Sequence, residues 1–249
     1  MNEPETELQT APVKERPQPA MALMLPRVLP FACYMGFIGL RELLSLIPAM
    51  QHQLAQLASY MYPLQALIVT AALCYALPRC PEFSLRDLGL RGQKGLNTFF
   101  AIATGLVVFA FWIQLDQPWA RIGTPPGFSP DIAPAGWQRD SLLLIRLLGA
   151  ALMVPVMEEL FWRSFIYRYV TNPAFTKVAI GVFHWPAFAA TAVLFGLEHH
   201  LVVAGILAGI SYNIVLIRTR SIAQCTLAHV VTNGVLGVWV IATESWGFW

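Results

Sequence analysis

Three polar motifs interrupt the otherwise apolar carboxyl-terminal half of the sequence. The first, Glu-Glu-Leu-Phe-Trp-Arg at 158–163, places three full charges inside the apolar run from 142 to 170. An ionised side chain at the centre of a bilayer costs roughly 2.5–3.5 kcal/mol on insertion scales, so such groups normally form pairs, line a wet cavity or take part in chemistry. This motif therefore predicts either a buried ionic network or a reactive site.

Helix geometry separates the two glutamates of this motif. Glu159 and Arg163 are four residues apart with the acid on the amino-terminal side, which is the favoured order for an ion pair. Glu158 lies about 100° further round the helix and has no such partner. We expect Glu159 and Arg163 to neutralise each other and Glu158 to be available as a base. A packing network that uses all three charges is the alternative.

The second motif is Phe-Gly-Leu-Glu-His-His at 195–200, which closes an apolar run. The carboxylate of Glu198 and the imidazoles of His199 and His200 suit a metal site, a proton relay, or an edge where a helix leaves the membrane. The order is not His-Glu-x-x-His, so the usual helical arrangement of zinc proteases is absent. The motif by itself leaves these three interpretations open.

The third motif pairs His229 with Asn233, four residues apart on an apolar helix. Both side chains can donate hydrogen bonds from the same helix face. Two donors aimed at one point are what an oxyanion needs, and the loss of one such donor costs on the order of 3 kcal/mol in known enzymes. A polar clamp between two membrane helices is the alternative interpretation.

Together the three motifs supply a base, a separate histidine and a pair of hydrogen-bond donors, which is the set needed to attack an amide with water. Their order and spacing, Glu-Glu-x-x-x-Arg, then Phe-x-x-x-His, then His-x-x-x-Asn, resembles the CPBP intramembrane proteases, the CAAX-protease and bacteriocin-processing family. The resemblance covers about residues 141–240. It implies an intramembrane endopeptidase of the glutamate type, with no cofactor and no obligatory metal.

The resemblance also implies roles for individual residues. Glu158 would be the general base that activates water, and His199 would hold the same water molecule. His229 and Asn233 would form the oxyanion hole. The expected substrate is a peptide bond in a membrane-associated protein or peptide, with or without an attached lipid.

Five further residues have supporting places in this scheme. Glu159 and Arg163 would be the structural ion pair, and Phe195 would pack beside His199. The motifs do not require Glu198 or His200, which we expect to modulate His199 or to form an adventitious metal site. A non-catalytic immunity or scaffolding protein of the same family, and a metal-dependent membrane protease, are the alternative functions. A transporter is disfavoured because the segments show no internal repeat.

Composition predicts the elements that must position these motifs. Hydrophobic residues make up 57% of the 249 residues and charged residues only 12%, about half the charged share of a soluble domain. The net charge of +2 gives no indication of nucleic-acid binding. Apolar segments long enough to span a bilayer predict an all-α polytopic transmembrane bundle of seven to eight helices. The segments are 28–48, 54–77, 96–115, 141–161, 177–198, 201–217 and 222–243.

Basic residues predict the orientation. With a cytoplasmic amino terminus, eleven Lys and Arg residues fall on the cytoplasmic side and two on the other, which satisfies the positive-inside rule. The eleven are Lys14, Arg16, Arg27, Arg79, Arg86, Arg91, Lys94, Arg168, Lys177, Arg218 and Arg220, and the two are Arg121 and Arg139. We expect a multi-pass protein of the bacterial inner membrane whose partners are the bilayer and a peptide substrate.

Four regions follow from the pattern: a disordered polar tail at 1–20, amino-terminal helices and loops at 21–140, a catalytic core at 141–243 and a short tail at 244–249. The basic loop at 78–95 is expected to be a solvated anchor with a short interfacial helix at 84–90. The four cysteines are expected to be buried thiols, because their spacing does not suit metal binding.

The seven-segment scheme contains one conflict. It places His199 at the outer end of its segment, whereas Glu158 and His229 lie nearer the cytoplasmic side. These residues can meet only if the chain bends near Pro186 or if one helix runs continuously from 187 to 217.

Overall fold

The computed structural model describes residues 20–123 and 127–249, so nearly all of the polar tail at 1–20 lies outside the described part of the chain. Within these two ranges the chain forms helices and no strands. The predicted all-α fold is therefore confirmed, and the protein is a multi-pass membrane protein.

Six helices in the described ranges are long and apolar enough to cross a membrane. They are α1 (Ala20–Ser45), α2 (Pro48–Ala76), α3 (Gly92–Gln114), a composite helix over Trp137–Thr171, α8 (Val202–Thr219) and α9 (Ile222–Thr243). The remaining apolar helix, α7 (Trp185–Leu197), has 13 residues and is only about 20 Å long, less than the roughly 30 Å of a bilayer core. The described part of the bundle thus has six helices long enough to span a membrane and one short helix, whereas the sequence predicts seven to eight spanning helices.

The composite helix changes its winding on both sides of the glutamate pair. Its parts are α4 (Trp137–Leu148), a π-helical segment at Gly149–Met153, α5 (Val154–Glu159), a second π-helical segment at Leu160–Ile166 and α6 (Tyr167–Thr171). Pro155 lies in the first turn of α5. Since proline has no N–H to donate to the preceding turn, the wider winding before it accommodates the missing bond.

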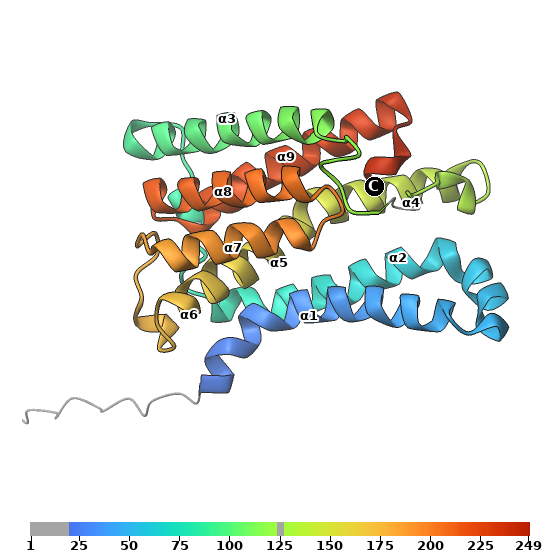
Figure 1. Ribbon diagram of the computed structural model, residues 1–249, viewed down its shortest axis with the longest axis horizontal. Coiled ribbons are helices and arrows are strands. Elements are labelled where there is room, and N and C mark those ends of the chain that lie inside the picture. The colour runs from blue at the N-terminus through green and yellow to red at the C-terminus, as the bar shows by residue number, and fades with distance from the viewer. Residues whose placement is uncertain (1–19, 124–126) are drawn as a thin grey trace, which may run out of the picture.

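Helices α7 and α8 form a hairpin whose turn, residues 198–201, lies inside the bundle (Figure 1). Small residues bring the two helices together. A Cβ atom on Gly205 would lie 2.8 Å from the Cα of Gly196, and one on Gly209 would lie 2.8 Å from the Cα of Ala192. The two backbones touch, as small-residue interfaces in membranes allow.

This hairpin corrects the predicted fifth and sixth segments. Pro186 lies in the first turn of α7, where a missing N–H costs nothing, so it starts the helix and does not bend it. A continuous helix from 187 to 217 is wrong, because the chain turns at 198–201. His199 therefore lies one short helix, about 20 Å, from the end of the bundle where α7 begins. The end of α6 lies at the same end of the bundle as the start of α7 (Figure 1). Glu158 lies 13 residues before Thr171, the last residue of α6, which is again about 20 Å along a helix.

Three smaller expectations also change. The interfacial helix expected at 84–90 is only a 3-10 turn, Leu85–Asp87. Cys80 and Cys225 are buried as expected, but Cys74 is exposed, so the expectation of buried thiols does not hold for all four cysteines. The residues after 243 fold back: Trp246–Phe248 forms a 3-10 turn, and the Trp246 carbonyl accepts a hydrogen bond from the Phe128 N–H.

Candidate active site

A cavity of about 370 Å³ opens inside the bundle between α1, the composite helix, α9 and the turn at 198–201. The four residues predicted to be catalytic all line it, together with three of the five predicted supporting residues. These seven are Glu158, His199, His229, Asn233, Phe195, Glu198 and His200. The other two, Glu159 and Arg163, lie buried behind the cavity wall. The structure thus brings together residues from three separate helices and a turn.

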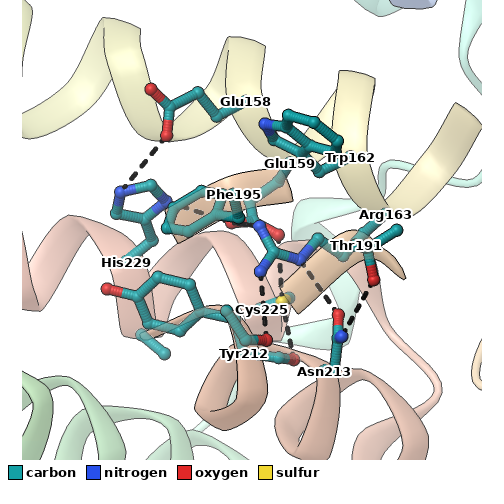
Figure 2. Close-up of polar contacts among 12 residues, drawn as sticks. Glu158, Glu159, Trp162, Arg163, Thr191, Phe195, Tyr212, Asn213, Cys225 and His229 are labelled. Carbon is teal, nitrogen blue, oxygen red and sulfur yellow. Dashed lines mark hydrogen bonds and ion pairs between the residues drawn. The ribbon is translucent and has the colours of Figure 1, made fainter. Parts of the chain in front are cut away.

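The Glu159–Arg163 ion pair is present, with 3.1 Å between Oε1 and Nη1, and neither side chain is exposed. Arg163 also donates from Nε to Asn213 Oδ1 and from Nη2 to the Gly209 carbonyl, both at 3.3 Å (Figure 2). A buried ion pair is tolerated when its remaining hydrogen-bonding positions are filled in this way. The pair therefore fixes the composite helix to α8.

His229 is held by the same glutamate. Its Nδ1 lies 3.0 Å from Glu159 Oε1, so this nitrogen donates to the carboxylate and the other ring nitrogen faces the cavity. Glu159 Oε2 accepts a weak bond from the thiol of Cys225 at 3.1 Å. Glu159 therefore orients two helices at once, through Arg163 and through His229.

Glu158 has the opposite surroundings. Its side chain is only 7% exposed, yet no residue in the described ranges forms a hydrogen bond with Oε2. The nearest polar group, His229 Nε2, lies 3.7 Å away, which is beyond hydrogen-bond distance (Figure 2). Because burying a carboxylate without partners is costly, its oxygens need a water molecule or a reacting group from the cavity.

The imidazole of His199 lies close to the carboxyl group of Glu158. Its Nδ1 lies 2.7 Å from the Phe195 carbonyl, which accepts the ring N–H and leaves Nε2 as the acceptor nitrogen. The Phe195 ring packs beside the imidazole, with 5.0 Å between ring centroids. One donor atom each from Glu158, Glu198 and His199 lie within 4.8 Å of one another. That spacing suits a shared water molecule and would also admit a cation.

Asn233 lines the cavity and also clamps two helices. Its Nδ2 donates to the Ala150 carbonyl at 3.0 Å, in the first π-helical segment. The second N–H of the amide is not used by that bond. Asn233 can therefore clamp two helices through one N–H and still donate the other N–H to an oxyanion.

Sequence reasoning missed the residues of α8 that support the site. The ring of Tyr212 stacks on His229 with 4.7 Å between centroids, and its hydroxyl donates to Thr232 at 2.9 Å. Asn213 holds Arg163 and donates to Thr191 at 2.9 Å. Their only signal in the sequence is the polar run Ser211-Tyr212-Asn213 in the middle of a largely apolar helix, which does not identify a partner.

Arg146 occupies the far part of the cavity. Its guanidinium lies 4.4 Å from the ring centroid of Tyr62 and 5.1 Å from that of Phe128, so the charge rests on two aromatic faces. Its Nε is buried and has no hydrogen-bond partner in the described part of the chain. The cavity therefore has carboxylates at one position and a cation at another.

A second buried ionic cluster surrounds Glu82, at the end of the bundle where α1 begins. Arg27 donates to both oxygens of Glu82, at 2.6 and 2.8 Å, and Ser164 and Arg168 also donate to Oε1. Burial alone would raise the pKa of Glu82, but hydrogen bonds from Arg27 and Ser164 and the charge of Arg27 outweigh it and lower the pKa. This loop was expected to be solvated, and its glutamate is instead a structural anchor.

Comparison with known proteins agrees with the motif resemblance. Residues 140–235 match the model of a family described as type II CAAX prenyl endopeptidase Rce1-like. The match begins near the amino-terminal end of the composite helix, ends in α9 and includes all three polar motifs. No curated protein and no solved structure matches the chain.

Proposed function

Residues 140–235 belong to the Rce1-like type II CAAX prenyl endopeptidase family, and on that premise we propose that the protein is an intramembrane endopeptidase of the glutamate type. It hydrolyses a peptide bond of a membrane-associated protein or peptide with a water molecule activated by Glu158. The observation that carries this proposal is the buried carboxyl group of Glu158, whose Oε2 has no hydrogen-bond partner among the described residues, beside the imidazole of His199.

In the first step, Glu158 takes a proton from water and the hydroxide attacks the scissile carbonyl carbon. His199 orients that water, because its Nε2 can accept the second water hydrogen while Nδ1 is held by Phe195. A general base of this kind typically contributes a factor of about 10²–10⁴ in rate.

The tetrahedral intermediate then needs donors for its oxyanion. Asn233 has one amide N–H left after its bond to Ala150. His229 donates from Nε2 when its ring is protonated, and Glu159 then serves as the counter-ion at Nδ1. Both donors line the same cavity as Glu158. Each such donor is worth on the order of 3 kcal/mol in enzymes that use an oxyanion hole.

The substrate reaches this site from the lipid side. Three residues of α1, Tyr34, Met35 and Ile38, form one wall of the cavity, and Trp112 of α3 forms another. An apolar wall of this kind accommodates an extended peptide close to a lipid or lipid anchor. With a cytoplasmic amino terminus in a bacterial inner membrane, the basic end of the bundle faces the cytoplasm.

The test uses the full-length protein in liposomes and two fluorescence-quenched peptides that differ only in a farnesyl group on cysteine. Glu158→Gln should lower turnover of the cleaved peptide by about 10²–10⁴-fold. The matched control is Glu42→Gln, which removes a carboxylate from the exposed end of α1 and should leave turnover unchanged. If neither peptide is cleaved, mass spectrometry of peptides from cell membranes containing wild type or Glu158→Gln identifies the substrate.

Retained turnover in Glu158→Gln would rule out the glutamate mechanism. Loss of wild-type activity in a chelator, restored by a divalent metal, would favour the metal-dependent alternative, for which Glu158, Glu198 and His199 have suitable spacing. Identical membrane peptides from wild type and Glu158→Gln would favour a non-catalytic immunity or scaffolding protein.

A further inference from the structure

Glu198 is a second buried carboxyl group in the cavity, and the proposed mechanism has not used it. It follows the last residue of α7, and 12% of its side chain is exposed. Its Oε1 accepts a hydrogen bond from the indole N–H of Trp162 at 3.0 Å. Its Oε2 is buried, and no residue of the described chain forms a hydrogen bond with it. One half of the group is thus fixed, and the other half is unpaired.

The carboxyl group of Glu198 lies close to that of Glu158. An oxygen of each carboxyl group and a ring nitrogen of His199 lie within 4.8 Å of one another. Oε2 of Glu158 is unpaired as well, so two buried carboxyl groups meet without a donor from the described residues to either Oε2 atom. The composite helix and the turn after α7 bring these groups together inside the bundle, away from the solvated surface where acidic patches usually lie.

The charges around this pair do not neutralise it. The composite helix contributes Glu158, Glu159 and Arg163 to the surroundings of Glu198, and Arg163 already binds Glu159, Asn213 and Gly209. The other titratable neighbours are His199 on the same turn, His229 of α9 and Tyr34 of α1. Two carboxylates within 4.8 Å of each other in a site of low dielectric constant repel strongly, which disfavours ionisation of both.

We propose that Glu198 is a second catalytic carboxyl group, which shares one proton with Glu158 and donates it to the leaving amine. This inference rests on the proposed peptide-bond hydrolysis. It gives the site two carboxyl groups with separate tasks, one as base and one as acid, where the family motifs provide only the base.

The proton inventory of the reaction balances. Ionised Glu158 takes one proton from water, and the water oxygen forms the new bond to the carbonyl carbon, which becomes a tetrahedral oxyanion. The C–N bond breaks as the oxyanion re-forms a carbonyl, and Glu198 gives its proton to the nitrogen. The products are a carboxylic acid and an amine. Protonated Glu158 then passes its proton to Glu198, which restores the starting pair.

The bond from Trp162 favours Glu198 as the acid of the pair. The indole N–H occupies Oε1, so the proposed proton resides on Oε2, the oxygen to which no described residue forms a hydrogen bond. Oε2 of Glu158 has no such fixed donor among the described residues, and the carboxyl group lies beside the imidazole of His199, which orients the water in the proposed mechanism. The alternative is that Glu198 only anchors the turn to Trp162, and two variants separate these roles.

The first test needs no substrate. Infrared difference spectra of the protein in liposomes compare wild type with Glu198→Gln and Glu158→Gln, and with Glu42→Gln as the control. Wild type should show the carbonyl stretch of one protonated carboxyl group at neutral pH, and each of the two cavity variants should lose or shift that band. The absence of this band from wild type, or a band that neither cavity variant changes, would overturn the proposal.

The second test measures kinetics on whichever peptide the wild type cleaves. Glu198→Gln keeps an acceptor for Trp162 but cannot give up a proton, so kcat should fall about 10²–10⁴-fold with little change in KM. The alkaline fall in kcat, which marks loss of the proton from Glu198, should disappear in this variant. Trp162→Phe removes the anchor but keeps the acid, and it should retain the alkaline fall.

The outcomes separate this inference from the proposed function. An inactive Glu158→Gln with a fully active Glu198→Gln would overturn only the role of Glu198. An active Glu158→Gln would remove the proposed function, while the infrared spectra would still decide whether the two groups share a proton. Stoichiometric zinc in the wild type that is lost from Glu198→Gln would overturn proton sharing in favour of a metal site.

Discussion

The protein buries two kinds of glutamate cluster, and they differ in how completely their charges are paired. Glu82 accepts from two arginines and a serine, which join the loop after α2 to α1, the second π-helical segment and α6. Glu158 is as deeply buried, but no donor from the described residues reaches its Oε2. A carboxylate with every position filled stabilises a fold, whereas one with an open position can accept a proton from a substrate water.

The pair Glu158 and Glu159 repeats this contrast within two consecutive residues. Glu159 accepts from Arg163, His229 and Cys225, and it is completely buried. Glu158 points to the cavity (Figure 2). Adjacent residues on a helix point about 100° apart, so one side chain can enter the packed interface between helices while the next remains at the cavity.

Glu158→Gln should give the largest functional effect, a loss of turnover of about 10²–10⁴-fold. Its thermal stability should equal or exceed that of wild type, because an amide replaces a buried carboxyl group that has no paired cation. Activity in liposomes and melting in detergent measure the two effects. A variant that loses both activity and stability would show that Glu158 belongs to the structural kind of cluster.

Glu82→Gln should show the reverse behaviour. It leaves Arg27 and Arg168 buried without their carboxylate, and removing one partner of a buried ion pair typically costs about 3–5 kcal/mol. Melting in detergent should reveal this loss, while the folded fraction at low temperature should keep the wild-type turnover per molecule. A turnover defect in fully folded Glu82→Gln would contradict the division between the two clusters.

The sequence predicted the local part of the site well. The i, i+4 spacing identified the pairing of Glu159 with Arg163, and the chain confirms it at 3.1 Å. The shared face of His229 and Asn233 follows from the same periodicity. These features depend only on helix geometry within one turn, so no knowledge of tertiary packing was needed.

The rest depended on contacts between distant segments. The bond from His229 to Glu159 joins residues 70 positions apart, and the approach of His199 to Glu158 depends on the length of α7. Hydropathy assigned the whole segment 177–198 to a spanning helix, because residues 178–184 are also largely apolar. The burial of Glu82 was missed for a similar reason: its arginine partners come from outside its own loop.

Gly205→Ala should test whether the hairpin sets the position of His199. The new Cβ would meet the Cα of Gly196 at 2.8 Å, so α7 and α8 must separate, and overpacking of this kind typically costs about 1–3 kcal/mol. Turnover should fall because the turn at 198–201 moves relative to Glu158. Gly234→Ala is the matched control, since its Cβ would meet only Ala151, at 3.8 Å. Equal turnover in the two variants would mean that the turn is positioned by other contacts.

Acid should remove the stabilisation of the folded state by the ionised Glu82 carboxylate. The loss of stability should be smaller than that caused by Glu82→Gln. The folded state holds the pKa of Glu82 below its ordinary value of 4.5, so its stabilisation is fully present above about pH 4.5 and is lost as the pH falls through the folded-state pKa. Melting temperatures from pH 7 to pH 3 should therefore fall more steeply for wild type than for Glu82→Gln, and the two curves should converge at low pH. Glu42→Gln, which alters an exposed carboxylate, should follow the wild-type curve. Parallel curves for wild type and Glu82→Gln would show that the arginines do not stabilise the ionised form of Glu82. The clusters around Glu82 and Glu158 would then differ in geometry but not in how much their charges stabilise the fold.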